Sequence, residues 1–293
     1  MTSALILQHD INKLPKRMTS DDVLRMLRFL PDQAISQAWG KISSIYIPEP
    51  MRRPVFGLWS AIIGCKLPAD FARYSSIMEL FIRKLPPGSR IFAINSELIS
   101  PADGHILTSG PITGDKITQV KKASYNLNSF LGDVPPILED PQNNTLYQMV
   151  IYLSPCSYHR FHAPAEFLID KCLHIPGELL PVAPWSSRVI SGIFNYNERV
   201  VMRGAWSYGF FSLTAVGATN VGSIQVNIPG IPELEANPPC TRCYSNLDYT
   251  SPPGAELGVF KFGSTVVLIF EAPRGINFSA IKGMDLRVGQ AIL

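Results

Sequence analysis

Four side chains in three separate segments could carry chemistry. Asp103 follows Ser-Pro-Ala, His159 and His162 flank Arg-Phe, and Ser264 follows a glycine at the start of an apolar run. An imidazole can remove the proton of a serine hydroxyl, and a carboxylate can hold that imidazole in the reactive orientation. The chain order Asp, His, Ser is one of several that permit such a triad, so the spacing allows nucleophilic catalysis but proves little.

Each of these residues also has a purely structural reading. An acid between Ala and Gly is most often a turn former. Two histidines three residues apart share one face of a helical turn but lie on opposite faces of an extended strand. A Gly-Ser step before an apolar run is also typical of an ordinary tight turn into a buried strand.

Zinc binding is the other chemistry that the residue types allow. The two histidines could act with Cys156 or Cys172, and Cys240 with Cys243 forms a Cys-x-x-Cys pair. A zinc site of that kind ordinarily needs a second pair of ligands, which this chain lacks. We therefore expect no metal site.

The bulk composition indicates a globular protein. The chain has 293 residues, of which 46% are hydrophobic and 17% charged, which excludes a disordered chain and allows a sizeable core. Its five cysteines are too few and too scattered for a disulfide framework. The longest charge-free apolar run, residues 54–65, is shorter than the roughly 20 residues that a membrane-spanning helix needs. No signal peptide is evident.

Charge is unevenly distributed along the chain. Residues 1–95 contain 13 Lys and Arg against 7 Asp and Glu, whereas residues 96–293 contain 13 against 16. A basic first third on an acidic body suits contact with an anionic surface, either a membrane or a nucleic acid.

The hydrophobic pattern predicts a helical first third. Thr19 or Ser20 can cap a helix that runs to about residue 30, and a second helical stretch covers residues 68–84. The Pro-Pro-Gly run at 86–88 ends it. The apolar faces of these helices fit either a core or a membrane surface.

After residue 95 the pattern becomes that of short strands separated by Gly and Pro. Five strands are predicted, at residues 146–153, 199–203, 210–216, 221–228 and 265–271. Residues 229–257 are rich in Pro, Asn and Ser and are predicted to form a long mobile loop. The expected fold class is α+β, with a helical region over 1–95 followed by a mostly β, sandwich- or barrel-like domain over 96–293.

Several motifs, taken in order, resemble those of phosphatidylserine decarboxylases, most closely the mitochondrial type. They are Ser-Pro-Ala-Asp-Gly at 100–104, Tyr-Leu-Ser-Pro at 152–155, Tyr-His-Arg-Phe-His at 158–162, His-Ile-Pro-Gly-Glu-Leu at 174–179, Phe-Phe-Ser-Leu-Thr-Ala-Val-Gly-Ala-Thr-Asn-Val-Gly-Ser-Ile at 210–224 and Phe-Gly-Ser-Thr at 262–265. The resemblance covers nearly the whole chain.

This resemblance implies a self-processing enzyme with a pyruvoyl cofactor. Asp103, His162 and Ser264 would form the processing triad, with His162 as the base and Asp103 holding its imidazole. Ser264 would attack the carbonyl of Gly263, and cleavage would give the fragments 1–263 and 264–293, with a pyruvoyl group derived from Ser264 on the second. That ketone would form a Schiff base with phosphatidylserine, CO₂ would leave, and His159 or His162 would protonate the product, phosphatidylethanolamine.

The resemblance also implies a partner and a location. The substrate is a lipid, so the basic region 1–95 is expected to meet a membrane surface rather than a nucleic acid. Peripheral attachment to the mitochondrial inner membrane is expected, although no transit peptide or transmembrane helix is visible. The sequence departs from the family pattern at Ser157, where an acidic residue is common.

Two other functions use the same residues. One is a non-catalytic relative that binds phosphatidylserine, which would have no need of all three triad groups. The other is a conventional serine hydrolase, although Ser264 lacks the Gly-x-Ser-x-Gly elbow.

Overall fold

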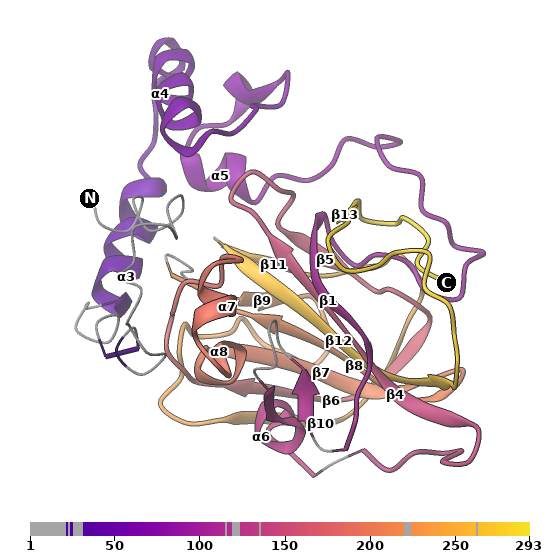
Figure 1. Ribbon diagram of the computed structural model, residues 1–293. Helices are drawn as coiled ribbons and strands as arrows, with labels where there is room; N and C mark the ends of the chain where they lie inside the picture. Colours follow the sequence, from indigo (N-terminus) through magenta and orange to yellow (C-terminus); the bar gives the residue numbers. More distant parts are fainter. Residues whose placement is uncertain are drawn as a thin grey trace.

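The computed structural model describes residue 22 and residues 24–25, 32–114, 116–118, 124–134, 136–219, 224–261 and 263–293. Most of the predicted helix after Thr19 and Ser20 therefore lies outside the described residues. Figure 1 shows the helical elements of the first third at one side of a large β structure.

The helical part consists of short elements around a small core of its own. They are α3 (Asp32–Ser43), α4 (Glu49–Ile63), the 3₁₀ turn η2 (Phe71–Arg73) and α5 (Ile77–Phe81). Phe56, Tyr74 and Leu80 are buried together beneath α4. The single helix predicted over 68–84 is wrong, because the chain forms η2 and α5 as two separate elements there. Ser76 is the N-cap of α5, and its side chain accepts a hydrogen bond from the Glu79 amide, so a new helix begins at this point.

The β part contains an eight-stranded antiparallel sheet in the order β10-β6-β7-β8-β12-β4-β1-β13. Its strands are β1 (Gly104–Pro111), β4 (Asn144–Leu153), β6 (Phe167–Ile175), β7 (Arg199–Trp206), β8 (Gly209–Val216), β10 (Arg242–Ser251), β12 (Ser264–Pro273) and β13 (Asp285–Leu286).

A three-stranded sheet, β5-β11-β9, packs on one face of the large sheet. It consists of β5 (Arg160–His162), β9 (Ile224–Val226) and β11 (Glu256–Phe260). Phe161 and Phe260 from this sheet share a core with Val266 and Leu268 of β12. Two sheets that bury their inner faces against each other form a sandwich.

The other face of the large sheet is covered by short elements. They are α6 (Leu127–Leu131), α7 (Ser186–Val189), α8 (Ile193–Tyr196) and the small hairpin β2 (Lys116–Thr118) with β3 (Ser124–Asn126). Their apolar side chains bury Val267 and Ile269, which alternate with the side chains that face the small sheet.

The expected α+β class with a mostly β sandwich domain is confirmed. The strands predicted near β4, β7, β8 and β12 are present within a few residues of their expected ends. The long loop predicted over 229–257 is wrong, because residues 242–251 form β10 and residues 256–260 form β11. β10 is an edge strand whose exposed polar residues hide the alternation that marks a buried strand.

Gly104 fixes how closely the segment that carries Asp103 approaches the sheet. A Cβ on Gly104 would stand 2.5 Å from the Tyr152 carbonyl oxygen and 2.7 Å from Ile151 Cγ2, both on β4. Backbone atoms cannot move aside as a flexible side chain can, so this position excludes even alanine.

Gly104→Ala should therefore destabilise the fold by roughly 1–3 kcal/mol and shift Asp103. Denaturant unfolding of the variant measures the change in the free energy of unfolding. Gly57→Ala is the matched control, because a Cβ on Gly57 in α4 meets no atom within 4 Å. Equal stability of the two variants would contradict this account of β1.

Candidate active site

Ser264 is the first residue of β12 and is fully buried. It pairs with Leu153 of β4, and its side chain faces the same core as Val266. Its exposed fraction is 0%, and its Oγ has no hydrogen-bond partner among the described residues. A buried hydroxyl without a partner costs about 1–3 kcal/mol, so a structure that keeps one calls for an explanation.

Gly263, immediately before this serine, has a backbone conformation that favours glycine. Its φ is +23°, in the region that side-chain-bearing residues rarely adopt. A Cβ there would meet only the Thr219 carbonyl oxygen, at 3.8 Å. The requirement for glycine is thus one of backbone conformation, since no described atom crowds the position of a Cβ.

His159 lies just before β5, and its neighbours fix the orientation of its ring. Its Nδ1 lies 2.8 Å from the Ser157 carbonyl oxygen, which can only accept, so Nδ1 carries the proton. In the neutral ring Nε2 is then the basic nitrogen, and it is buried with no partner among the described residues. Phe81 of α5 packs on the ring at 3.8 Å between centroids.

The backbone brings His159 toward the serine. The Phe260 amide at the end of β11 donates to the His159 carbonyl at 2.9 Å, and Ser264 follows Phe260 by four residues. On the other side, β4 leads from Leu153, the partner of Ser264, into the loop that carries His159. Two independent connections therefore converge on one end of the sandwich.

Burial strongly disfavours a charge on His159. Loss of solvent lowers the pKa of its imidazole to about 3, an effect that the nearby Arg83 reinforces and the hydrogen bond to Ser157 opposes. At neutral pH the ring is therefore uncharged, with a free lone pair on Nε2.

His162, at the end of β5, has both ring nitrogens engaged. Nδ1 donates to the Gly254 carbonyl at 2.9 Å, so Nε2 is the acceptor and takes the Tyr158 hydroxyl at 3.0 Å. Burial lowers the pKa of His162, while Gly254, Glu256 and Asp103 oppose that shift. In this state the basic nitrogen of His162 is covered by Tyr158.

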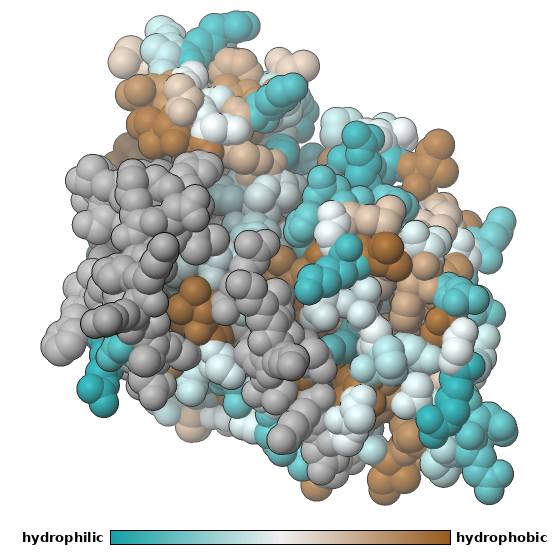
Figure 2. All heavy atoms as spheres, in the orientation of Figure 1, coloured by the Kyte–Doolittle hydropathy of each residue, from teal (hydrophilic) through white to brown (hydrophobic). Residues whose placement is uncertain are grey.

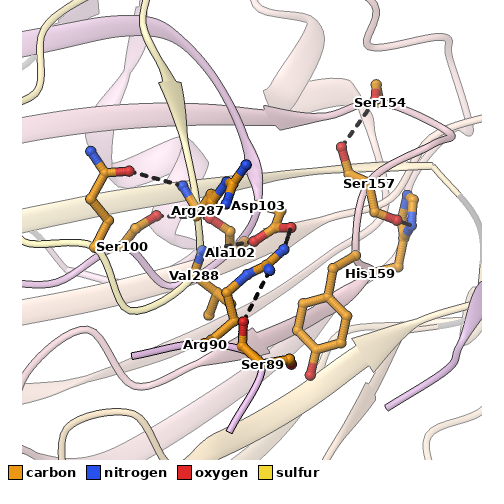
Figure 3. Close-up of polar contacts among 12 residues, drawn as sticks. Ser89, Arg90, Ser100, Ala102, Asp103, Ser154, Ser157, His159, Arg287 and Val288 are labelled. Carbon is orange, nitrogen blue, oxygen red and sulfur yellow. Dashed lines mark hydrogen bonds and ion pairs between the residues drawn. The ribbon is translucent and has the colours of Figure 1, made fainter. Parts of the chain in front are cut away.

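Asp103 precedes β1 and is paired with an arginine. Its Oδ2 lies 2.9 Å from an Arg90 guanidinium nitrogen, and its Oδ1 accepts the Val288 amide at 2.8 Å. Figure 3 shows this group beside the separate cluster of Ser154, Ser157 and His159. The His162 amide donates to the Pro101 carbonyl at 2.8 Å, so the backbones of the two predicted partners are joined near Asp103.

The four predicted residues thus reach one end of the sandwich in two pairs. Asp103 is linked to His162 through the Pro101 carbonyl, and His159 is linked through its own carbonyl to Phe260, four residues before Ser264. The carboxylate and the two imidazoles hydrogen-bond to other groups here. Sequence reasoning missed Arg90 as the Asp103 partner and Phe81 as the His159 neighbour, since both contacts join segments far apart in the chain. Tyr158, the hydrogen-bond partner of His162, belongs to the motif at 158–162, so its place in that motif was the signal that could have identified it.

Cysteine chemistry differs from the expectation. Cys156, considered above as a zinc ligand, forms a disulfide with Cys65. Cys172 is buried, while Cys240 and Cys243 are exposed free thiols. Within the part of the chain that is described, no group of three His, Cys, Asp or Glu side chains is arranged to hold a metal ion.

One hollow of the described structure lies away from these residues. A hollow of about 280 Å³ lies at the sheet edge formed by β10, lined by residues that include His174, Glu235 and Arg242. It contains none of the four predicted site residues.

The lowered pKa of His159 predicts that the free energy of unfolding falls as the pH falls. The unfolded chain binds a proton near the ordinary value of 6.5, whereas the folded chain binds it only near 3. The stabilising contribution is therefore present above about pH 6.5 and is lost as the pH falls toward 3.

We expect His159→Gln to reduce the loss of stability between pH 7 and pH 5 by about 2 kcal/mol, as measured by denaturant unfolding at both pH values. His105→Gln, on an exposed histidine that pairs with Asp285, serves as control. An unchanged pH dependence in His159→Gln would show that His159 titrates normally.

Comparison with known proteins identifies the family. The family model described as phosphatidylserine decarboxylase matches residues 77–293. Among curated proteins, the chain is 36% identical to the mitochondrial phosphatidylserine decarboxylase proenzyme of Cricetulus griseus, over 96% of this chain and 76% of that protein.

Proteins with similar descriptions from other organisms also match. The Caenorhabditis elegans protein is 37% identical over 95% of this chain and 75% of its own length. Proenzyme 1 of Arabidopsis thaliana is 33% identical over 91% of this chain and 73% of its own length. With a family model that covers most of the chain and relatives aligned over nearly all of it, this chain belongs to the phosphatidylserine decarboxylase family.

Proposed function

We propose that this decarboxylase cuts its own chain between Gly263 and Ser264 and converts Ser264 into a pyruvoyl cofactor. The observation that carries the proposal is a pair of buried groups that have no hydrogen-bond partner within the described parts of the chain. They are the Ser264 hydroxyl and His159 Nε2, and Gly263, with its positive φ, directly precedes the serine. An exposed nucleophile would suit hydrolysis of an external substrate, whereas a fully buried one suits attack on its own chain.

Self-cleavage begins with attack of Ser264 Oγ on the Gly263 carbonyl carbon. A histidine takes the hydroxyl proton and returns it to the Ser264 nitrogen as the amide bond breaks, leaving an ester. Loss of the Ser264 α-proton then breaks the Cβ–O bond and releases Gly263 as a carboxylate. Water replaces the nitrogen of residue 264 and ammonia leaves, which yields the ketone.

His162 is the proposed base for this step, with Asp103 as the group that orients it. Their joined backbones and the influence of Asp103 on the His162 pKa support that pairing. For His162 to act, Tyr158 must release Nε2 and Asp103 must turn from Arg90 toward the ring. In both histidines Nδ1 donates to a backbone carbonyl, that of Ser157 for His159 and that of Gly254 for His162. Nε2 is therefore the basic nitrogen in each ring, and this is the tautomer that proton removal needs.

His159 is proposed to move protons in the decarboxylation of phosphatidylserine. The pyruvoyl group would supply a ketone that forms a Schiff base with the headgroup amine and accepts the electron pair left by CO₂. The headgroup ammonium must first lose a proton. His159 Nε2 is the proposed acceptor, with the anionic carboxylate and phosphate of the bound headgroup raising the pKa of the imidazole above its value of about 3 in this state. The resulting imidazolium can later protonate the product, phosphatidylethanolamine.

The sheet supports a stable two-chain product. The fragment 264–293 contains β12, which pairs with β4 along its whole length and with β8 from Thr265 to Phe270. A break before Ser264 leaves these hydrogen bonds intact. The fragments 1–263 and 264–293 are therefore expected to remain one folded unit.

A membrane surface is the proposed site of action. Met51, Leu58 and Ile62 form an exposed apolar stripe on α4, with exposed fractions of 52%, 64% and 54%. Their spacing places them on one helix face, away from the buried Phe56. Figure 2 shows hydrophobic side chains at this projection of the molecule. Lys66, three residues after the end of α4 and also exposed, suits anionic lipid headgroups.

Peripheral attachment to the mitochondrial inner membrane is the corresponding proposal for location. The relatives are described as mitochondrial. Across the described ranges of the chain, no helix is long and apolar enough to cross a bilayer.

Single alanine variants should separate the proposed roles. Ser264→Ala and His162→Ala should leave one uncut chain, with His162→Ala slowing cleavage by about 10²-fold or more because a general base is lost. His159→Ala should still be cut but should decarboxylate phosphatidylserine about 10²-fold more slowly. Denaturing gels report cleavage, and release of labelled CO₂ reports turnover.

His105→Ala is the matched histidine control and should behave as the unaltered protein. Efficient cutting of Ser264→Ala would overturn the assignment of the cleavage site. A cut His162→Ala together with an uncut His159→Ala would transfer the role of base to His159, whose Nε2 is already free.

The apolar stripe on α4 makes a separate prediction. Leu58→Glu with Ile62→Glu should weaken binding to phosphatidylserine-containing vesicles by about tenfold or more, because two apolar side chains no longer enter the interface. Vesicle flotation measures binding. Ile137→Glu, at an exposed apolar residue of the β domain, is the control, and equal binding by both variants would exclude α4 as the docking face.

A further inference from the structure

A disulfide joins the helical part of the molecule to the loop that carries His159. Cys65 and Cys156 are bonded although 91 residues separate them. Cys65 directly follows the C-cap of α4, and Cys156 lies between β4 and β5, three residues before His159. The bond therefore connects the helix with the exposed apolar stripe to a proposed catalytic loop.

The Cys65 end of the bond is rigidly held. Its amide donates to the Ser60 carbonyl at 3.0 Å, and its carbonyl accepts a hydrogen bond from the Ser60 hydroxyl. Phe56 of the same helix is fully buried in the small helical core with Tyr74 and Leu80. A displacement of α4 must therefore move Cys65 with it.

The Cys156 end sits in a loop with few other restraints. The Ser157 amide donates to the Ser154 carbonyl at 2.9 Å, and the two hydroxyl groups lie 3.0 Å apart. The Ser157 carbonyl then holds His159 Nδ1, as Figure 3 shows. The position of this turn thus sets both the tautomer and the direction of the His159 ring.

Two further contacts join the same two parts. Phe81 of α5 packs against the His159 ring, and the Arg160 Nε donates to the Ile82 carbonyl at 2.9 Å. These contacts restrain the ring and the start of β5. The disulfide restrains the turn on the other side of His159, so the ring is held from both sides by the helical part.

We infer that the Cys65–Cys156 disulfide is a positioning element for His159, and that its reduction lowers the rate of decarboxylation. This inference rests on the role proposed above for His159. The disulfide ties the turn that contains Cys156 and Ser157 to the helical part, and this holds the His159 ring with Nε2 in its reactive direction. Without the disulfide the turn can move, and the ring can rotate out of that direction.

The bond is open to chemical control. Cys156 is exposed, so a small dithiol can attack its sulfur, whereas Cys65 is buried. The dithiol is oxidised to its own disulfide while Cys65 and Cys156 each gain one electron and one proton as thiols. Burial raises the pKa of the remaining buried thiol, Cys172, to about 12, which keeps it from competing as a thiolate.

The test compares Cys65→Ser, Cys156→Ser and the double variant with the unaltered enzyme, each with and without dithiothreitol. Cys240→Ser with Cys243→Ser is the matched control, because it removes two exposed free thiols and keeps the disulfide. Decarboxylation is measured on vesicles and on dispersed short-chain phosphatidylserine, at temperatures well below the unfolding midpoint of every variant. Peptide mapping without reductant verifies the bond itself.

We expect kcat to fall about tenfold in all three serine variants and in the reduced enzyme, with KM for the short-chain substrate nearly unchanged. The double variant should match the single ones, and dithiothreitol should have no further effect on them. A merely stabilising bond would lower the unfolding midpoint and leave kcat unchanged at low temperature, which would overturn the inference.

The remaining outcomes are equally distinct. An intact bond whose reduction leaves kcat unchanged contradicts the positioning role, as does peptide mapping that finds both thiols free in fully active enzyme. If the unaltered enzyme, with its disulfide intact, neither cuts itself nor releases CO₂, the proposed function is refuted. That result is distinct from a failure of the inference about the disulfide.

Discussion

The antiparallel ladder between β12 and β4 is the constraint on which the remainder of the structure depends. It runs without a register shift from Ser264 opposite Leu153 to Pro273 opposite Asn144. A slip of one residue would turn every buried side chain of β12 to the other face. Because both faces of β12 are packed, the register is strongly specified, and with it the place and direction of Ser264.

That constraint also relates the candidate site to the fold. β4 leads from Leu153 directly into the turn that carries Cys156 and His159, and the small sheet returns through β11 to Gly263. Strand pairing thus fixes the position of Ser264, while the segments that directly precede β5 and β1 carry His159 and Asp103. Burial removes water from the Ser264 hydroxyl and keeps His159 neutral, with a lone pair on Nε2, while the lowered pKa makes that nitrogen a weaker base than in water.

The sequence pattern predicted the buried strands well, because runs of β-branched and aromatic residues are typical of buried strands. Residues 146–153 and 265–271 contain dense β-branched and aromatic side chains and form β4 and β12. β10 was missed because its residues are polar and exposed, and its pairing with β6 is supplied by backbone hydrogen bonds that composition does not reveal. The helix expected over 68–84 was interrupted by capping at Ser76, a local feature that the apolar spacing conceals.

The sequence motifs name candidate residues for the site but only part of their contacts. Motifs supplied Asp103, His159, His162 and Ser264. Their present partners, Arg90 and Tyr158, depend on segments that meet only in the folded chain. The disulfide was beyond reach for the same reason, since 91 residues separate its cysteines and no spacing rule pairs them. These contacts hold the proposed triad in a resting arrangement in which Asp103 and His162 are each occupied by another group.

The most direct test of the central claim is the intact mass of freshly purified, unaltered protein. Self-processing at the Gly263–Ser264 bond predicts two components, residues 1–263 and a fragment 264–293 whose mass is lower than that of the plain peptide by one ammonia. A carbonyl reagent should label that fragment alone. A single unmodified chain of 32.4 kDa that nevertheless releases CO₂ from phosphatidylserine would contradict the account.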